Sequence, residues 1–160
     1  MKKSVFISHR TKDQAIADML LNFFARAGLP ISDIFCSSRP ENAVKLTVSR
    51  ETRTALEASV VNIATLSREY YRSAYCLNEA GVFWMMEDVP VIPIALPDIT
   101  ENDLLGFLNS DYHLRRLDKQ TDISFIYRTV RETLSIPTAD EVLLTSDTGT
   151  KRSMRYTHCR

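Results

Sequence analysis

The sequence predicts an α/β domain in which helices cover both faces of a parallel β-sheet. The first observation is that short apolar runs alternate about five times with segments of helical periodicity. The second is that the chain has 160 residues, of which 44% are hydrophobic, so that it is long enough to bury the core of one domain. Such alternation is typical of a sheet whose strands are joined by crossover helices.

Five segments are predicted to form strands because they are short and bounded by turns or helical patterns. They cover residues 4–8, 33–36, 59–66, 89–96 and 113–118. Pro90 and Pro93 weaken the fourth strand, since proline cannot donate a hydrogen bond to a ladder. Ligands of parallel sheets bind beyond the carboxyl ends of the strands, where residues 8–10, 36–39 and 66–68 are expected to lie.

Helical segments separate the predicted strands. Thr11 and Gln14 have the spacing of a capping box, and Gly28 and Pro30 are expected to end the helix that Thr11 opens. Further helices are predicted over residues 46–58, 73–86, 100–108 and 123–134. Residues 1–137 therefore make up the predicted domain, and the polar residues 138–160 are predicted to form a flexible tail.

Composition and spacing exclude several kinds of partner and site. Lys plus Arg and Asp plus Glu both number 20, so no net charge attracts nucleic acid or an anionic membrane. Three scattered cysteines and three histidines fit neither a disulfide framework nor a metal site, and Cys76 is expected to be a core residue. The chain lacks a signal peptide and a membrane-spanning stretch, which predicts a soluble, cytoplasmic protein.

Familiar nucleotide-binding and hydrolase motifs are absent. The four glycines are far apart, so neither a P-loop nor a dinucleotide-binding G-x-G-x-x-G is present. The third predicted strand ends in A-T-L-S, without the aspartate that a response-regulator receiver needs there, and no G-x-S-x-G occurs. Kinases, NTPases, ordinary Rossmann dehydrogenases and receivers are thereby excluded.

Glu79 is the first candidate for chemistry. It is the single charged residue of S-A-Y-C-L-N-E-A-G-V-F-W-M-M, residues 73–86, and Tyr75 precedes it by one helical turn. Burying an ionised carboxylate is costly. Glu79 is therefore either a helical glutamate whose carboxylate reaches solvent or pairs with an arginine such as Arg68 or Arg72, or a carboxylate at the rim of an aromatic cleft. The second arrangement suits an oxocarbenium-like transition state.

Two loops supply further candidates. Ser8, His9 and Arg10 follow the first strand, either as a polar lead-in to the helix or as groups that bind ribose and phosphate without a glycine loop. Ser37, Ser38 and Arg39 open the polar loop after the second strand, as a simple connection or as a ligand or partner loop.

Three motifs together resemble a Toll/interleukin-1 receptor (TIR) domain of the bacterial type. They are V-F-I-S-H at 5–9, D-I-F-C-S-S at 33–38 and S-A-Y-C-L-N-E at 73–79. The resemblance covers roughly residues 3–135 and implies a flavodoxin-like fold with a five-stranded parallel sheet. It also implies an NAD-cleaving protein of the Thoeris-like, antiphage-defence kind.

The resemblance implies a role for each candidate residue. Glu79 takes the place of the catalytic glutamate, and Tyr75 takes that of the usual tryptophan, which stacks near the nicotinamide. Further contacts to NAD+ are expected from two loops and their strands: Phe6, Ser8, His9, Arg10, Cys36, Ser37, Ser38 and Arg39. No cofactor or metal is implied, because NAD+ is the substrate and the products are nicotinamide and ADP-ribose or a cyclic isomer.

The resemblance also implies partners, and it leaves two other functions open. Self-association through TIR–TIR contacts and a separate effector protein activated by the product are expected. The first alternative is a TIR–TIR interaction module without catalysis, against which Glu79 and Tyr75 weigh. The second is a nucleoside deoxyribosyltransferase-like enzyme, in which the carboxylate would be a nucleophile.

Overall fold

A computed structural model of the protein describes residues 4–36, 48–108 and 112–137. The strands are β1 (Ser4–Ser8), β2 (Ile34–Cys36), β3 (Ser59–Leu66) and β4 (Val91–Ala95). The helices are α1 (Gln14–Arg26), α3 (Val48–Ala58), α4 (Arg68–Tyr71), α5 (Ala74–Met85) and α6 (Gln120–Thr133), with 3₁₀ turns η1 (Thr11–Asp13), η2 (Ile31–Asp33) and η3 (Glu101–Asp103). The predicted loop at 37–45 and the predicted tail at 138–160 lie outside the described residues.

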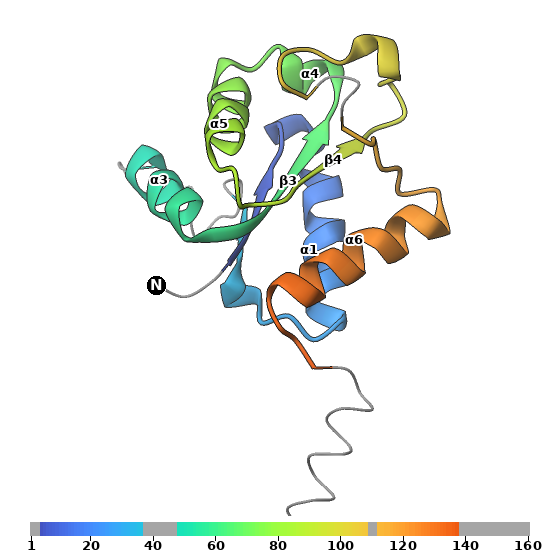
Figure 1. Ribbon diagram of the computed structural model, residues 1–160. Helices are drawn as coiled ribbons and strands as arrows, with labels where there is room; N and C mark the ends of the chain where they lie inside the picture. Colours follow the sequence, from blue (N-terminus) through green and yellow to red (C-terminus); the bar gives the residue numbers. More distant parts are fainter. Residues whose placement is uncertain (1–3, 37–47, 109–111, 138–160) are drawn as a thin grey trace, which may run out of the picture.

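The four strands of the described residues pair in parallel, in the order β2-β1-β3-β4 (Figure 1). Ile7 of β1 lies opposite Cys36 of β2 on one side and opposite Ile63 of β3 on the other. The chain leaves β1 first toward β2 and later crosses to β3, so the strand order reverses between β1 and β3. The predicted α/β fold is confirmed, and the carboxyl ends of β1 and β3 border the crevice in which such sheets bind ligands.

Alternate residues of the strands face two hydrophobic cores, one on each side of the sheet. Helices α1 and α6 pack on the side that receives Val5 and Ile7, whereas α3, α4 and α5 pack on the side that receives Phe6 (Figure 1). Ser8 is buried and two residues beyond Phe6, so it faces the same side as Phe6. This alternation directs the Ser8 hydroxyl toward α5.

The fifth predicted strand contributes one bridge instead of a strand. Arg115 bridges Ile94 of β4, with its N–H donating to the Pro93 carbonyl at 2.9 Å and its carbonyl accepting from Ala95 N–H at 2.8 Å. The Arg115 side chain pairs with Asp122 of α6 at 3.2 Å, which draws this segment toward the helix. The Pro93 carbonyl points toward Arg115 and away from β3, and the nitrogen of the same residue points the same way. Pro93 is therefore tolerated in β4, because no hydrogen bond to β3 is required from its nitrogen.

The helix ends differ in part from those predicted. Thr11 lies in the turn η1, and α1 begins at Gln14 without a side-chain cap, so the predicted capping box is wrong. Ser73 does cap α5, because its Oγ accepts from Cys76 N–H at 3.3 Å. The helix predicted over residues 100–108 is reduced to the turn η3. These differences change where helical segments begin and end, but they leave the layers of the fold as predicted.

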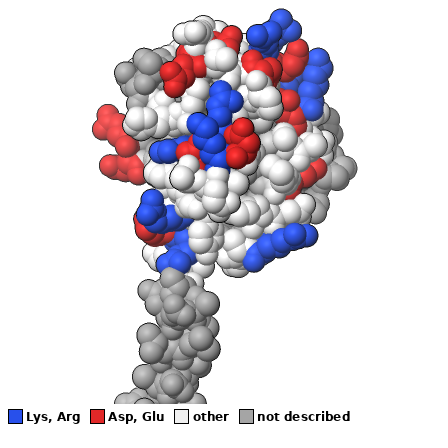
Figure 2. Space-filling view, turned by 90° about the vertical axis from the view of Figure 1, so that its right-hand side faces the viewer, with Lys and Arg blue, Asp and Glu red and all other residues white. Residues whose placement is uncertain are grey.

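The surface carries both signs of charge. Basic and acidic side chains are interspersed on the face shown in Figure 2. Among the helices that the structure describes, none has the length and apolar character needed to cross a membrane.

Phe83 of α5 provides a test of this packing. Its ring is buried and lies edge-on to Phe6, with 5.8 Å between the ring centroids. Phe83→Ala is expected to lower the free energy of unfolding by about 3–5 kcal/mol, measured by urea denaturation, because it leaves a cavity under α5. Trp84→Ala, at a neighbouring side chain that is 64% exposed, serves as the control and is expected to cost less than about 1 kcal/mol. Equal losses in the two variants would contradict the packing described.

Candidate functional site

Glu79 lies in the middle of α5 and is only 4% exposed. Its Oε2 accepts a hydrogen bond from Ser8 Oγ at 2.5 Å. Its Oε1 is also buried and has no hydrogen-bond partner among the described residues. Burial raises the pKa of Glu79 to about 7, and the Ser8 hydrogen bond opposes this rise. The carboxylate is therefore held by one oxygen only, and half of its hydrogen-bonding capacity is unused within the described fold.

Tyr70 supports this hydrogen bond from α4. Its hydroxyl lies 3.0 Å from Ser8 Oγ and 3.3 Å from the carbonyl of Cys76, to which it donates. When Glu79 is ionised, the Ser8 proton points to the carboxylate, so the single Tyr70 proton is shared between Ser8 Oγ and the Cys76 carbonyl. Burial raises the pKa of Tyr70 well above its ordinary value, which keeps the hydroxyl protonated. Tyr70, Ser8 and Glu79 thus form one buried chain of hydrogen bonds.

A pocket of about 710 Å³ opens between α3 and α5 next to Glu79. Its lining residues are Thr52, Arg53, Leu56 and Glu57 of α3, together with Tyr75, Asn78, Glu79, Val82 and Met86 of α5 and its end. Tyr75 is 42% exposed, and its hydroxyl donates to Thr52 Oγ1 at 2.8 Å. A volume of this size is typical of small-molecule sites, and its wall combines apolar side chains with polar and charged ones.

Several predicted site residues lie behind this pocket instead of lining it. Phe6 is fully buried and stacks on Phe35, with 5.2 Å between the ring centroids. His9 and Cys36 are buried beside each other, with Cys36 Sγ 3.7 Å from His9 Nδ1. Burial lowers the pKa of His9 and therefore favours the neutral imidazole at neutral pH. In this conformation these three residues support the site, and Ser8 reaches Glu79 from the same layer.

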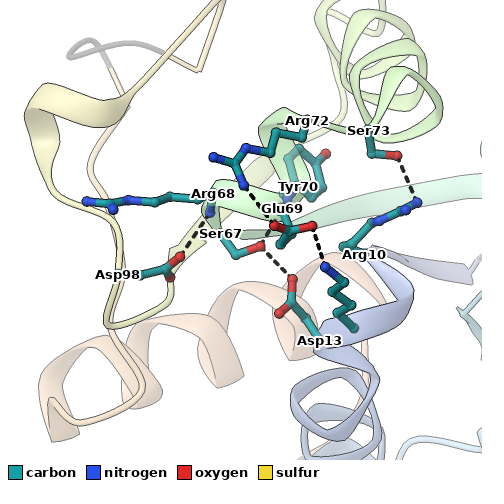
Figure 3. A network of polar contacts seen from close by, with 10 residues as sticks. Arg10, Asp13, Ser67, Arg68, Glu69, Tyr70, Arg72, Ser73 and Asp98 are labelled. Carbon is teal, nitrogen blue, oxygen red and sulfur yellow. Dashed lines mark hydrogen bonds and ion pairs between the residues drawn. The ribbon is translucent and has the colours of Figure 1, made fainter.

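Arg10 belongs to a polar network at the carboxyl ends of β1 and β3 (Figure 3). Its Nη1 donates to Ser73 Oγ at 3.5 Å, at the residue that caps α5. Asp13 accepts from Ser67 Oγ at 2.6 Å, and Ser67 in turn caps α4 by accepting from Tyr70 N–H. The Arg10 bond holds the start of α5, which carries Glu79, and the Asp13 bond holds the start of α4, which carries Tyr70.

The interpretation that Glu79 pairs with Arg68 or Arg72 is wrong. Arg72 instead pairs with Glu69 at 3.0 Å, and Glu69 also binds Lys12 at 2.9 Å, on the outside of α4 (Figure 3). The backbone N–H of Arg68 donates to Asp98. Lys12 and Arg72 lower the pKa of Glu69, and the ion pairs with these two exposed side chains contribute little to stability.

The structure adds residues that the sequence did not single out and omits others. Val82 and Met86 follow Glu79 at helical spacing, so their place on the pocket wall could have been inferred from periodicity. Thr52 and Tyr70 reach the site from other helices, which no local pattern reveals. The predicted residues Ser37, Ser38 and Arg39 lie outside the described residues.

The cysteines and histidines of the described residues form no metal centre. Within residues 4–36, 48–108 and 112–137, no group of three or more His, Cys, Asp or Glu side chains could hold a metal ion. Cys76 is buried, and burial raises the pKa of its thiol, so it lacks the thiolate character of a nucleophile.

Comparison with known families decides the relationship that these features suggest. Residues 5–125 match the family described as the TIR domain. The chain belongs to the TIR domain family. This family includes members that cleave NAD and members that act as signalling scaffolds.

Two solved structures agree with this assignment. The TIR domain of the Toll-related receptor TRR-2 from Hydra magnipapillata superimposes with a TM-score of 0.59 at 18% identity, covering 82% of this TIR domain chain and 97% of the receptor domain. The TIR domains of the activated Roq1 resistosome, which directly recognizes the pathogen effector XopQ, superimpose with a TM-score of 0.53 at 16% identity. This match covers 94% of the present chain and 99% of the Roq1 chain. Both likenesses show the fold.

The uncharacterized protein YddK of Bacillus subtilis (strain 168) is 29% identical to this TIR domain over 87 residues. That match covers 53% of this chain and 33% of YddK, so this chain spans about a third of the length of the relative.

The raised pKa of Glu79 predicts a stability that depends on pH. The folded protein holds this proton up to about pH 7, whereas an unfolded glutamic acid releases it near 4.5, so the parent loses stability as the pH rises between these values. Glu79→Gln removes this loss. The variant is expected to match the parent near pH 4.5 and to exceed its free energy of unfolding by about 3 kcal/mol at pH 8.

Urea denaturation at both pH values measures the difference. Glu87→Gln, which changes an exposed carboxylate just after α5, is the matched control and should shift the free energy of unfolding by less than about 0.5 kcal/mol. Parallel stability curves for the parent and Glu79→Gln would refute the assigned pKa.

Proposed function

We propose that this TIR domain cleaves NAD+ at the nicotinamide–ribose bond, with Glu79 as the catalytic residue. The observation that carries the proposal is the Glu79 carboxylate, which is buried at the pocket wall with Oε2 bound to Ser8 and Oε1 unpartnered among the described residues. Leaving a buried charged oxygen unpartnered is unfavourable. A ribose hydroxyl of the substrate would supply the missing hydrogen bond.

The pocket fits the reacting end of a nicotinamide nucleotide. Its volume of about 710 Å³ accommodates a planar ring and a ribose, and the Tyr75 ring offers a face for stacking next to Glu79. Because Oε1 is buried, contact with the ribose requires the Glu79 side chain to turn into the pocket that it lines. After this rotation, Oε1 would leave its buried position and accept a hydrogen bond from the ribose hydroxyl.

The proposed chemistry depends on electrostatic stabilisation and positioning. The bond between C1′ of the ribose and N1 of nicotinamide breaks, and its electron pair leaves with the nicotinamide, which becomes neutral. The ionised Glu79 stabilises the oxocarbenium ion that remains. Water then attacks C1′ and gives up a proton, so the products are nicotinamide, ADP-ribose and one proton. Attack by a group of the adenosine part would give a cyclic isomer and the same proton.

The two alternatives explain the site less well. A pure interaction module has no use for a carboxylate whose burial costs stability, and Glu79 is only 4% exposed. A deoxyribosyltransferase-like enzyme would use Glu79 as a nucleophile, for which a pKa of about 7 is also compatible. Trapping of a glycosyl-enzyme with a deoxynucleoside, without nicotinamide release from NAD+, would favour that alternative.

The family suggests the biological setting of the proposed activity. Other TIR domains cleave NAD or act in signalling assemblies, so the product is proposed to serve as a signal in antiphage defence. Self-association of TIR domains and an effector protein that recognises the product are the proposed partners. The Roq1 TIR domains belong to an activated resistosome, which supports self-association as part of the proposal.

Nicotinamide release tests the proposed function directly. The purified parent at high concentration is expected to release nicotinamide from NAD+, and Glu79→Gln is expected to lower the rate by about 10²-fold or more, because the amide carries no charge to stabilise the oxocarbenium ion. Glu87→Gln is the matched control and should retain the parental rate. Equal rates for the parent and Glu79→Gln would remove Glu79 from the mechanism.

The activity should also depend on pH through Glu79. Because the ionised form is required and its pKa is about 7, kcat/KM for NAD+ is expected to fall about tenfold for each pH unit below that value and to level off above it. Ser8→Ala removes the hydrogen bond that lowers this pKa, so its profile should move to higher pH. A profile that Ser8→Ala leaves in place would show that the titrating group is not Glu79.

A further inference from the structure

Tyr75 and Thr52 join the two walls of the pocket. Tyr75 comes from the first turn of α5 and Thr52 from α3, and the tyrosine hydroxyl donates to Thr52 Oγ1 at 2.8 Å. Thr52 is only 4% exposed, whereas Tyr75 is 42% exposed. Both line the pocket together with Glu79. A buried hydroxyl therefore holds the tip of a side chain that is partly exposed to solvent.

This hydrogen bond restricts the aromatic ring at the point where orientation matters. A half-exposed tyrosine on a helix surface can occupy more than one rotamer, and the position of its ring changes with χ1. A bond at the far end of the ring selects the rotamer that reaches α3. Ordering a ring before the ligand arrives removes that entropy cost from binding.

The bond also bears on the tyrosine at position 75, where the resemblance to TIR domains implies a tryptophan. The indole of tryptophan presents a larger stacking face, but it has no hydroxyl at the tip of the ring. Tyrosine presents less area, and the Thr52 contact compensates by fixing its place. Tyr75 and Thr52 therefore act together, although they lie 23 residues apart in the sequence and belong to different helices.

We propose that Thr52 is a positioning residue of this site, whose hydroxyl holds the Tyr75 ring beside Glu79 for stacking against the nicotinamide ring of the substrate. The inference rests on the proposed function, since it names the partner that orients the substrate there. Thr52 acts through Tyr75 and does not touch the reacting atoms. Its contribution is to substrate binding, which predicts a change in KM with kcat nearly unchanged.

Variants that remove each half of the bond test the inference. Thr52→Val keeps the volume of the side chain and removes the acceptor, and Tyr75→Phe keeps the ring and removes the donor. Thr52→Ser restores the acceptor and provides the rescue. Thr54→Val is the matched control, because Thr54 lies on the same helix, is exposed and does not line the pocket. Thermal melting of every variant identifies any that fails to fold.

Two readouts separate this inference from the proposed function. The first is KM and kcat for NAD+ cleavage, and the second is Kd for NAD+ by calorimetry in the Glu79→Gln background, in which turnover is expected to be strongly reduced. Thr52→Val and Tyr75→Phe are each expected to raise KM and Kd about 3- to 10-fold. The double variant should show no further loss, because both changes delete the same bond. Thr52→Ser should recover most of the affinity.

Each outcome decides one of the two statements. Cleavage by the parent, together with unchanged KM and Kd in Thr52→Val, would overturn the inference and leave the proposed function standing. No cleavage, together with NAD+ binding that Thr52→Val weakens, would overturn the proposed function and support the inference. Additive losses in the double variant would also overturn it, since the two residues would then act separately. Neither cleavage nor binding would overturn both.

Discussion

The hydrogen bond from Ser8 to Glu79 is the constraint around which the rest of the site is arranged. It joins the last residue of β1 to the middle of α5 across an otherwise apolar layer. A hydrogen bond to a charged group contributes about 1.5–3 kcal/mol, which offsets only part of the cost of burying a carboxylate. The fold supplies the remainder through the packing of α5. Stability is thus lost locally in order to keep a carboxylate at the pocket wall.

The alternation of apolar runs and helical segments was sufficient to predict the α/β fold, because strand and helix periods differ clearly. Glu79 could also be identified, since a lone charge among apolar residues stands out in any sequence. The fifth strand could not be predicted correctly. The segment around Arg115 is held by contacts of the Arg115 side chain with α6. The guanidinium pairs with Asp122 and lies over the Phe125 ring, 3.7 Å from its centroid, and these contacts are not visible in the local sequence pattern.

The residues around Glu79 were harder to predict for a physical reason. Ser8 was a candidate for ligand binding, but its part as the donor to Glu79 depends on a contact across 71 positions of the chain. Tyr70 and Thr52 enter the site through contacts between helices, which the local pattern of hydrophobic residues does not encode. Sequence periodicity places side chains on faces, whereas partners across a site follow only from packing.

Pro93 has a consequence for how copies of this domain can meet. It lies in β4, at the border of the described sheet, with its carbonyl directed outward and no N–H to offer beside it. Arg115 already occupies part of this border. An incoming strand would therefore find an interrupted row of donors, which discourages continuous sheets from forming between neighbours. Contacts between copies at this edge must then be made by side-chain surfaces, which separate without breaking a backbone ladder.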